Sequence, residues 1–264
     1  MKVVFTGASG HLGRKFLDLF PNTTPFSIRY GDNEKLIGLS KELPGTDVLI
    51  HASVNLAPKD IDTAFRDNVI LPFDILDMAG KVNPNTHIIL ISSMSLLGED
   101  CQPRKLRDMT IYAASKFIME ELAVGVAKNP ITIVRFSTLF YFDYLKDGLS
   151  KMVYNAWKSK SIVASDCRRD FLPIWVACRW LNKLCGNKAW YNRTINLASG
   201  TSMNMMDVAK YLVDKYEVSC HNTPLPDYTD ICYKFSPDDP QSLERVTFDI
   251  YRLIDEYYEK LKGK

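Results

Sequence analysis

The sequence Val3-Val4-Phe5-Thr6-Gly7-Ala8-Ser9-Gly10-His11-Leu12-Gly13 lies at the start of the chain. The apolar and β-branched residues at its beginning predict a short buried strand over residues 2–6. Apolar side chains then recur with a helical spacing at Leu12, Phe16, Leu19 and Phe20. The sequence therefore predicts a strand that passes through a glycine-rich turn directly into an amphipathic helix.

The three glycines of this turn lie three residues apart, at Gly7, Gly10 and Gly13. Glycines in this position allow a sharp bend, a close approach of the backbone to a pyrophosphate, and tight packing of helix on strand. The first amide groups of the following helix attract a phosphate. We expect the pyrophosphate of a dinucleotide cofactor to be bound by Gly7, Gly10, His11, Leu12 and Gly13. The alternative is a turn of the same kind that binds nothing.

The segment Tyr112-Ala113-Ala114-Ser115-Lys116 follows about a hundred residues later. In a helix, this spacing places the phenol and the ammonium one turn apart on the same face. A free phenol titrates near ~10 and is a poor base at neutral pH unless a nearby cation stabilises the phenolate. Taken alone, the pair also fits an ordinary amphipathic helix. Together with the glycine turn, it predicts a proton donor beside the reactive ring of the cofactor.

Composition sets limits that agree with this interpretation. With 264 residues and 46% hydrophobic content, the chain can bury the core of one domain with a small lobe. A net charge of +2 does not favour nucleic acid or a membrane surface as a partner. No apolar run approaches the roughly 20 residues of a membrane span, and no signal peptide precedes the first strand, so we expect a cytoplasmic protein. The six cysteines show no Cys-x-x-Cys spacing, so neither a metal site nor a set of disulfides is expected.

Strand-like and helical segments alternate along the chain. Strands are expected at residues 25–30, 47–52, 87–92 and 131–136, and helices at 61–79 and 112–127. This alternation predicts an α/β fold with a Rossmann-type doubly wound parallel sheet and a small C-terminal substrate-binding lobe. The core is expected over residues 1–136 with 170–199 returning to it, and the lobe over 137–169 and 200–264. The later elements are helices at 149–158, 205–216 and 247–262, a strand at 194–197, and a loop-rich stretch marked by Pro224, Pro226, Pro237 and Pro240.

In this order, the motifs resemble the extended short-chain dehydrogenases/reductases, a family of nucleotide-sugar epimerases, dehydratases and reductases. The resemblance covers most of the chain. It is carried by the glycine turn and by five further segments, which are Asp47-Val48-Leu49-Ile50-His51-Ala52-Ser53, Asn68-Val69-Ile70-Leu71-Pro72, Ser92-Ser93 five residues before Gly98, Arg169-Asp170-Phe171, and Ile195-Asn196-Leu197-Ala198-Ser199-Gly200.

The resemblance implies a role for each of these positions. Tyr112 becomes the general acid or base at a sugar carbonyl or hydroxyl, Ser93 a hydrogen-bond donor to the same oxygen, and Lys116 a ligand of the nicotinamide ribose. Cofactor binding is further expected at the glycine turn, Arg29, Ala52, Ser53 and Asn68, and substrate binding at Ser93, Thr138 and Arg169. Asn68 could equally brace the sheet, and a buried core position for His51 remains open beside a catalytic one. A homodimer through the helix that carries Tyr112 is also implied, although Phe117, Ile118 and Leu122 of this helix could equally belong to the core.

Departures from the family pattern narrow the expected function. Residues 25–47 leave room for one strand and one helix only, as in short reductases of the dTDP-4-dehydrorhamnose reductase type. Arg29 favours the 2′-phosphate of NADP, whereas Asp32 leaves NAD open. Met94 and Ser95 stand where dehydratases carry an acidic pair. The leading expectation is the reduction of a 4-keto sugar nucleotide. The alternatives are an epimerase that retains NAD, and a cofactor-binding sensor or scaffold without turnover.

Overall fold

The computed structural model describes residues 1–98, 102–142, 147–223 and 248–263. The chain divides into two compact units. The first unit comprises Met1–Leu96, Pro103–Phe136 and Ala177–Leu197, and the second comprises Leu97–Gln102, Ser137–Val176 and Ala198–Lys264. No helix within the described ranges is long and apolar enough to cross a membrane.

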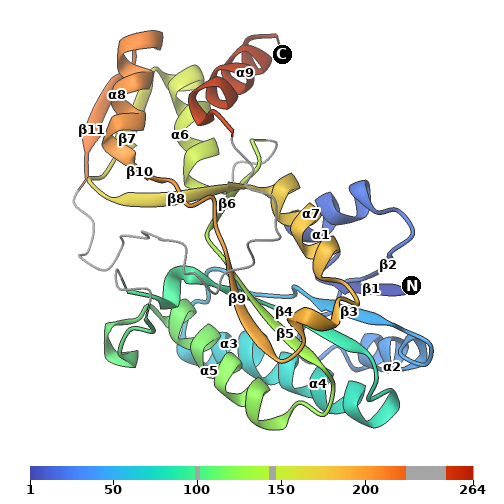
Figure 1. The fold of residues 1–264 in the computed structure, drawn as a ribbon. Coiled ribbons are helices and arrows are strands. Elements are labelled where there is room, and N and C mark those ends of the chain that lie inside the picture. Colours follow the sequence, from blue (N-terminus) through green and yellow to red (C-terminus); the bar gives the residue numbers. More distant parts are fainter. Residues whose placement is uncertain (99–101, 143–146, 224–247, 264) are drawn as a thin grey trace. The chain divides into compact units, whose positions relative to one another are not determined.

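A six-stranded parallel sheet forms the centre of the first unit (Figure 1). The strand order is β2-β1-β3-β4-β5-β9. The bounds are Val3–Thr6 for β1, Thr24–Phe26 for β2, Val48–His51 for β3, His87–Ser93 for β4, Ile131–Phe136 for β5 and Arg193–Leu197 for β9. The chain turns to one side of β1 for β2 and to the other side for β3. In open sheets of this kind, ligands bind at the carboxyl ends of the strands, where the order reverses.

Helices cover both faces of this sheet, which confirms the predicted doubly wound fold. One face packs on α2 (Asn33–Glu42), α4 (Leu71–Val82) and α5 (Ile111–Val126). Every second residue of the strands contributes its side chain to the core on this face. The other face carries α1 (His11–Leu19) and α7 (Ile174–Leu184), as Figure 1 shows. Phe5 of β1 and Phe16 of α1 meet there, with ring centroids 5.0 Å apart.

The helix predicted over residues 61–79 has an interruption. It consists of α3 (Ile61–Phe65), a π-helical turn η1 (Arg66–Ile70) and α4. Asn68 lies in the π-helical turn and is completely buried. Such turns are rare in proteins and are found frequently at functional sites.

The strand predicted over residues 25–30 is wrong in its length, because β2 ends at Phe26. The hydroxyl of Ser27 accepts a hydrogen bond from the Ser9 amide at 3.2 Å. The backbone then turns at Gly31, whose φ of +84° suits glycine. Arg29 therefore lies in the connection between β2 and α2 instead of at a strand end. As predicted, residues 25–47 hold only this strand and α2.

The second unit contains two small sheets and three helices in its described part. Strands β6 (Thr138–Phe140), β8 (Arg168–Pro173) and β10 (Ser202–Asn204) form one sheet, and β7 (Ser161–Ala164) pairs with β11 (Ser219–Asn222) in the other. The predicted helices correspond to α6 (Gly148–Ser159), α8 (Met205–Tyr216) and α9 (Ile250–Lys262). Of the predicted loop-rich stretch, the four prolines and residues 224–247 lie outside the described residues.

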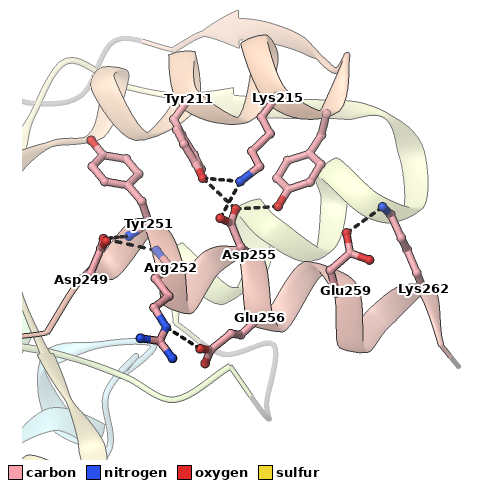
Figure 2. A network of polar contacts seen from close by, with 10 residues as sticks. Tyr211, Lys215, Asp249, Tyr251, Arg252, Asp255, Glu256, Glu259 and Lys262 are labelled. Atoms are coloured by element: carbon pink, nitrogen blue, oxygen red, sulfur yellow. Dashed lines mark hydrogen bonds and ion pairs between the residues drawn. The ribbon is translucent and has the colours of Figure 1, made fainter.

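A polar network attaches α9 to α8 (Figure 2). The Asp255 carboxylate accepts hydrogen bonds from the Tyr211 hydroxyl at 2.7 Å, the Tyr216 hydroxyl at 2.6 Å and the Lys215 ammonium at 2.5 Å. Beside it, the rings of Tyr216 and Tyr258 stack with centroids 3.6 Å apart. These contacts make Asp255 the centre of the α8–α9 contact.

No disulfide joins the cysteines of the described part, which are Cys167, Cys178, Cys185 and Cys220. Cys101 and Cys232 lie outside the described residues.

Candidate active site

The turn after β1 is pressed against the residues that follow β3. A Cβ atom on Gly7 would lie 2.6 Å from the Ala52 carbonyl group and 2.7 Å from the Ser53 amide nitrogen, and Gly7 has a φ of +80°. A Cβ atom on Gly13 would lie 2.4 Å from the Gly7 oxygen. Both positions therefore require glycine, and the turn lies where the strand order reverses.

The first turn of α1 provides a candidate phosphate site. The helix begins after Gly10, and no side chain caps it. His11 and Leu12 form its first turn and are half-buried. An uncapped helix N-terminus presents amide donors and a partial positive charge, which suit a pyrophosphate.

A pocket of about 260 Å³ lies beyond the end of β2. Arg29, Asp32, Leu71 and Asp74 contribute to its lining. Arg29 is exposed. The Asp32 carboxylate caps α2 by accepting the Lys35 amide at 3.2 Å, and it pairs with the Lys35 ammonium at 3.1 Å. The Asp32 carboxylate is thus already bonded at the start of α2, whereas the guanidinium of Arg29 is accessible to a ligand.

Ser93 and Tyr112 meet at the carboxyl end of β4. The Ser93 hydroxyl lies 2.9 Å from the Ser95 hydroxyl and accepts the Ser95 amide at 3.1 Å. Burial raises the pKa of Tyr112 to about 12, and a hydrogen bond with the Ser93 side chain acts in the opposite direction. The Tyr112 phenol is therefore protonated at neutral pH.

Lys116 lies one turn further along α5 and is 2% exposed. Its ammonium donates to the Met119 sulfur at 3.4 Å, and a thioether is a weak acceptor. Burial lowers the pKa of Lys116 to about 8, and the charge of Glu120 acts in the opposite direction. A buried ammonium with so poor an acceptor fits the hydroxyl groups of a bound ribose.

Two further buried polar atoms adjoin this region. His51 binds the Thr6 hydroxyl through Nδ1 at 2.7 Å, while its Nε2 atom has no partner. Burial, followed by the charge of Lys116, lowers the pKa of His51 to about 3, so the imidazole is neutral. The Ser53 hydroxyl is also buried without a partner. Unsatisfied buried polar atoms beside the glycine turn fit a dinucleotide cofactor bound there.

Asn68 braces the loop after β3 against α5. Its side-chain amide donates to the Ser115 hydroxyl and to the Asn55 carbonyl, both at 3.0 Å, and its oxygen accepts the Asn55 amide at 2.8 Å. These bonds use both the donor and the acceptor side of the amide. A direct contact of Asn68 with a cofactor stays a prediction.

Two of the predicted substrate-binding residues belong to the second unit. Thr138 lies on β6 opposite Phe171 of β8. Arg169 lies on β8 and is half-buried. The neighbouring Asp170 accepts hydrogen bonds from the amides of Ser199 and Gly200 at 2.9 and 2.8 Å. This carboxylate therefore stabilises the backbone at Ser199 and Gly200, which belong to the second unit as well. The other predicted site residues lie in the first unit.

Glu120 and Arg135 are not among the site residues expected from the sequence. Both side chains are largely buried, and they form an ion pair at 2.6 Å. The available signal was the position of Glu120 one helical turn after Lys116. The partner on β5 could not be found in this way, because the contact depends on how α5 packs on the sheet.

Comparison with solved structures shows the same fold in several proteins. Pal from Bacillus thuringiensis has a TM-score of 0.85 at 12% identity, over 100% of this chain and 99% of that chain. UDP-glucuronic acid 4-epimerase from Bacillus cereus, in complex with UDP-glucuronic acid and NAD, has a TM-score of 0.77 at 19% identity, over 100% and 99%. dTDP-glucose 4,6-dehydratase from Bacillus anthracis, in complex with NAD, has a TM-score of 0.80 at 15% identity, over 100% and 97%. At these identities the likeness extends to the fold alone.

Sequence comparison gives the family. A search of curated proteins finds no match. The model of the NAD dependent epimerase/dehydratase family matches residues 21–171, which is more than half of the chain. The match includes Ser93, Tyr112 and Lys116, and the glycine turn at residues 7–13 precedes it. The chain therefore belongs to the NAD dependent epimerase/dehydratase family.

Proposed function

We propose that this protein reduces the 4-keto group of a nucleotide-activated sugar with NADPH. The observation that carries the proposal is the arrangement of Tyr112, whose phenol is hydrogen-bonded to Ser93 at the end of β4, with Lys116 one turn further along α5. Reduction of a carbonyl leaves a negative charge on its oxygen, which needs a proton. A phenol that stays protonated at neutral pH, beside a second hydroxyl, suits this task.

The three residues divide the work at the carbonyl oxygen. Ser93 donates a hydrogen bond that orients the carbonyl, and Tyr112 gives its proton to the oxygen as the C–H bond forms. The Lys116 charge stabilises the phenolate that remains, until the phenol regains a proton from solvent. When bound, NADPH supplies the hydride that the carbonyl carbon accepts.

In this proposal, the glycine turn and the pocket beyond β2 bind the cofactor. Gly7, Gly10 and Gly13 admit the pyrophosphate, and the pocket beyond β2 takes the adenosine. Arg29 in this pocket offers a guanidinium to the 2′-phosphate of NADP, a charge-assisted hydrogen bond that NAD cannot make. Ala52 and Ser53 line the other side of the glycine turn.

The substrate is proposed to be a sugar carried on a nucleoside diphosphate. Arg169 suits the diphosphate, because a guanidinium binds phosphate oxygens through two parallel hydrogen bonds. Thr138 supplies a hydroxyl for the sugar. Met94 and Ser95 follow Ser93 and provide no acid for the elimination of water, which argues against a dehydratase.

An epimerase with tightly retained NAD is the second candidate. It is supported by NAD in the similar structures of the Bacillus cereus epimerase and the Bacillus anthracis dehydratase. An epimerase oxidises and then reduces the same carbon, so Tyr112 would have to accept a proton as well as donate one. A sensor or scaffold without turnover would have no use for Ser93, Tyr112 and Lys116 together.

We also propose a homodimer. Large apolar side chains are exposed on the helices of the first unit, including Phe65 of α3, Phe73 of α4 and Leu122 of α5. A contact between two copies would remove this apolar surface from water. Light scattering of the purified protein measures the molar mass directly, and a mass near 30 kDa rejects the dimer.

Cofactor binding distinguishes the catalytic candidates. The purified protein is titrated with NADPH and with NADH by fluorescence, and the released small molecules are analysed after denaturation. Tighter binding of NADPH to an empty protein supports the reductase. Retained NAD without a preference for NADPH rejects the reductase and favours the epimerase.

A further inference from the structure

A buried ion pair lies on the turn of α5 that follows Lys116. Glu120 is 3% exposed, and its carboxylate accepts two hydrogen bonds from the Arg135 Nε atom at 3.0 and 3.1 Å and one from Nη2 at 2.6 Å. The Ser92 hydroxyl donates to the same carboxylate. Both oxygens of Glu120 are therefore fixed by groups on the sheet.

The partners of Glu120 belong to the strands beside the candidate site. Ser92 of β4 directly precedes Ser93, and Arg135 of β5 lies opposite Ser92 in the strand register. Tyr112, Lys116 and Glu120 follow one another at four-residue intervals along α5. Glu120 thus fixes the helix that carries Tyr112 and Lys116 to the strand that carries Ser93.

The charges that face Lys116 come from two elements. Tyr112 and Glu120 lie on its own helix, and His51 faces it from β3. Tyr112 is neutral because its pKa is about 12, and His51 is neutral because its pKa is about 3. Glu120 is the acidic group among these three, and a further charged group, the Arg135 guanidinium of β5, is paired with its carboxylate at 2.6 Å.

We propose that Glu120, held by Arg135 and Ser92, is a positioning residue that fixes α5 on the sheet and places a carboxylate one helical turn from Lys116. The importance of Glu120 for catalysis rests on the proposed function. The effect of Glu120 on Lys116 does not rest on it, because the protonation of Lys116 is measurable in the free protein without any substrate.

The test follows the titration of Lys116 by NMR in protein labelled with carbon-13 at lysine Cε. The Lys116 signal is assigned by its loss in Lys116→Met. In the wild type we expect a midpoint near pH 8. In Glu120→Gln the midpoint falls by about one pH unit or more, because an attractive charge is lost and the Arg135 cation is left unpaired. Glu120→Asp keeps the charge and gives a smaller fall.

A neighbouring residue provides the matched control. Glu121 lies on the exposed side of the same helix, so Glu121→Gln removes the same charge and leaves the Lys116 midpoint unchanged. The double variant Glu120→Gln/Arg135→Met replaces the ion pair by neutral side chains. It leaves no unpaired buried ion, so its folded state is less destabilised than that of Glu120→Gln. Because no unpaired Arg135 cation remains, the Lys116 midpoint falls less in this double variant than in Glu120→Gln.

An unchanged Lys116 midpoint in the Glu120→Gln and double variants overturns the proposal, as does a fall of equal size in Glu121→Gln. A protein that binds cofactor but turns over no sugar nucleotide contradicts the proposed function. That result leaves the measured link between Glu120 and Lys116 intact, so the two failures are distinguishable.

Discussion

Tyr112 and Lys116 lie on successive turns of α5, and burial moves their pKa values in opposite directions. The pKa of the phenol rises to about 12, while that of the ammonium falls to about 8. Both shifts favour the uncharged form of the group, as burial requires. Below pH 8 the pair thus consists of a neutral phenol and a cation, which is the state that a proton donor to a reduced carbonyl needs.

Cofactor affinity should depend on pH through Lys116. The ammonium is present below its pKa of about 8 and is lost above it, so the charge-assisted hydrogen bonds that we propose to a ribose weaken above this pH. We expect the Kd of NADPH to be constant between pH 7 and 7.5 and to rise towards about tenfold per pH unit above pH 8. Fluorescence titrations from pH 7 to 9.5 measure it. The Lys116→Met variant should bind more weakly with a flat profile, and an equally steep profile in this variant would refute the assignment.

Arg29 should decide between the two cofactors. A hydrogen bond to a charged group contributes about 1.5–3 kcal/mol, so Arg29→Ala should weaken NADPH binding by at least about tenfold. NADH binding should change little, because NADH has no 2′-phosphate. Lys41→Ala, in the last turn of α2, serves as the control for a general loss of positive charge. Equal losses for both cofactors would place Arg29 outside the phosphate site.

His87 should make the first unit sensitive to acid. Its Nδ1 atom accepts the Gly186 amide at 3.3 Å, so Nε2 carries the hydrogen and donates to the Thr132 hydroxyl at 2.7 Å. Burial lowers the pKa of His87 from 6.5 to about 4. Between these two pH values, His87 is protonated in the unfolded chain but remains neutral in the folded chain. The free energy of unfolding should therefore fall as the pH drops from 6.5 towards 4, by up to about 3 kcal/mol.

Urea denaturation at pH 7.5, 6 and 5 tests this dependence. The His87→Asn variant should be less stable at pH 7.5 but should lose less stability on acidification than the wild type. The exposed His221 provides the control, and His221→Asn should keep the slope of the wild type. Identical slopes in the wild type and His87→Asn would show that His87 is not the group responsible.

Asp255 should hold α9 in place. Its carboxylate accepts three hydrogen bonds from α8, and an amide in its place cannot accept from all three donors with a full charge (Figure 2). We expect Asp255→Asn to lower the free energy of unfolding by about 2 kcal/mol. The control is Glu256→Gln, which breaks only an exposed pair with Arg252 and should cost less than about 0.5 kcal/mol. Equal stabilities of the two variants in urea would contradict this role.

The sequence predicts the central strands of the first unit well because their signals are local. Val48-Leu49-Ile50 and Ile88-Ile89-Leu90 are buried on both faces of the sheet, so their apolar runs are continuous. The glycine turn is equally local, since Gly7 and Gly13 leave no room for a Cβ atom. The small sheets of the second unit have weaker signals, because β6 and β10 contain three residues each.

The helix that carries Tyr112 and Lys116 could be predicted from the sequence, whereas the electrostatics of the candidate site could not. The spacing of Tyr112 and Lys116 indicates that they share a helix face. Their pKa values depend on burial and on Glu120, His51 and Ser93, which come from separate turns and strands. In the free protein, burial of the phenol dominates the pKa of Tyr112, and stabilisation of a phenolate by Lys116 stays a prediction.

The most direct test of the account is NADPH oxidation in the presence of 4-keto sugars carried on different nucleoside diphosphates, followed by the loss of absorbance at the nicotinamide band. We predict turnover with at least one of them, and a decrease in kcat of at least about 100-fold in Tyr112→Phe with little change in the Kd of NADPH. The variant keeps the ring and removes only the proton donor. Turnover that is undiminished in Tyr112→Phe, or bound NADPH without oxidation by any of these sugars, would contradict the central claim.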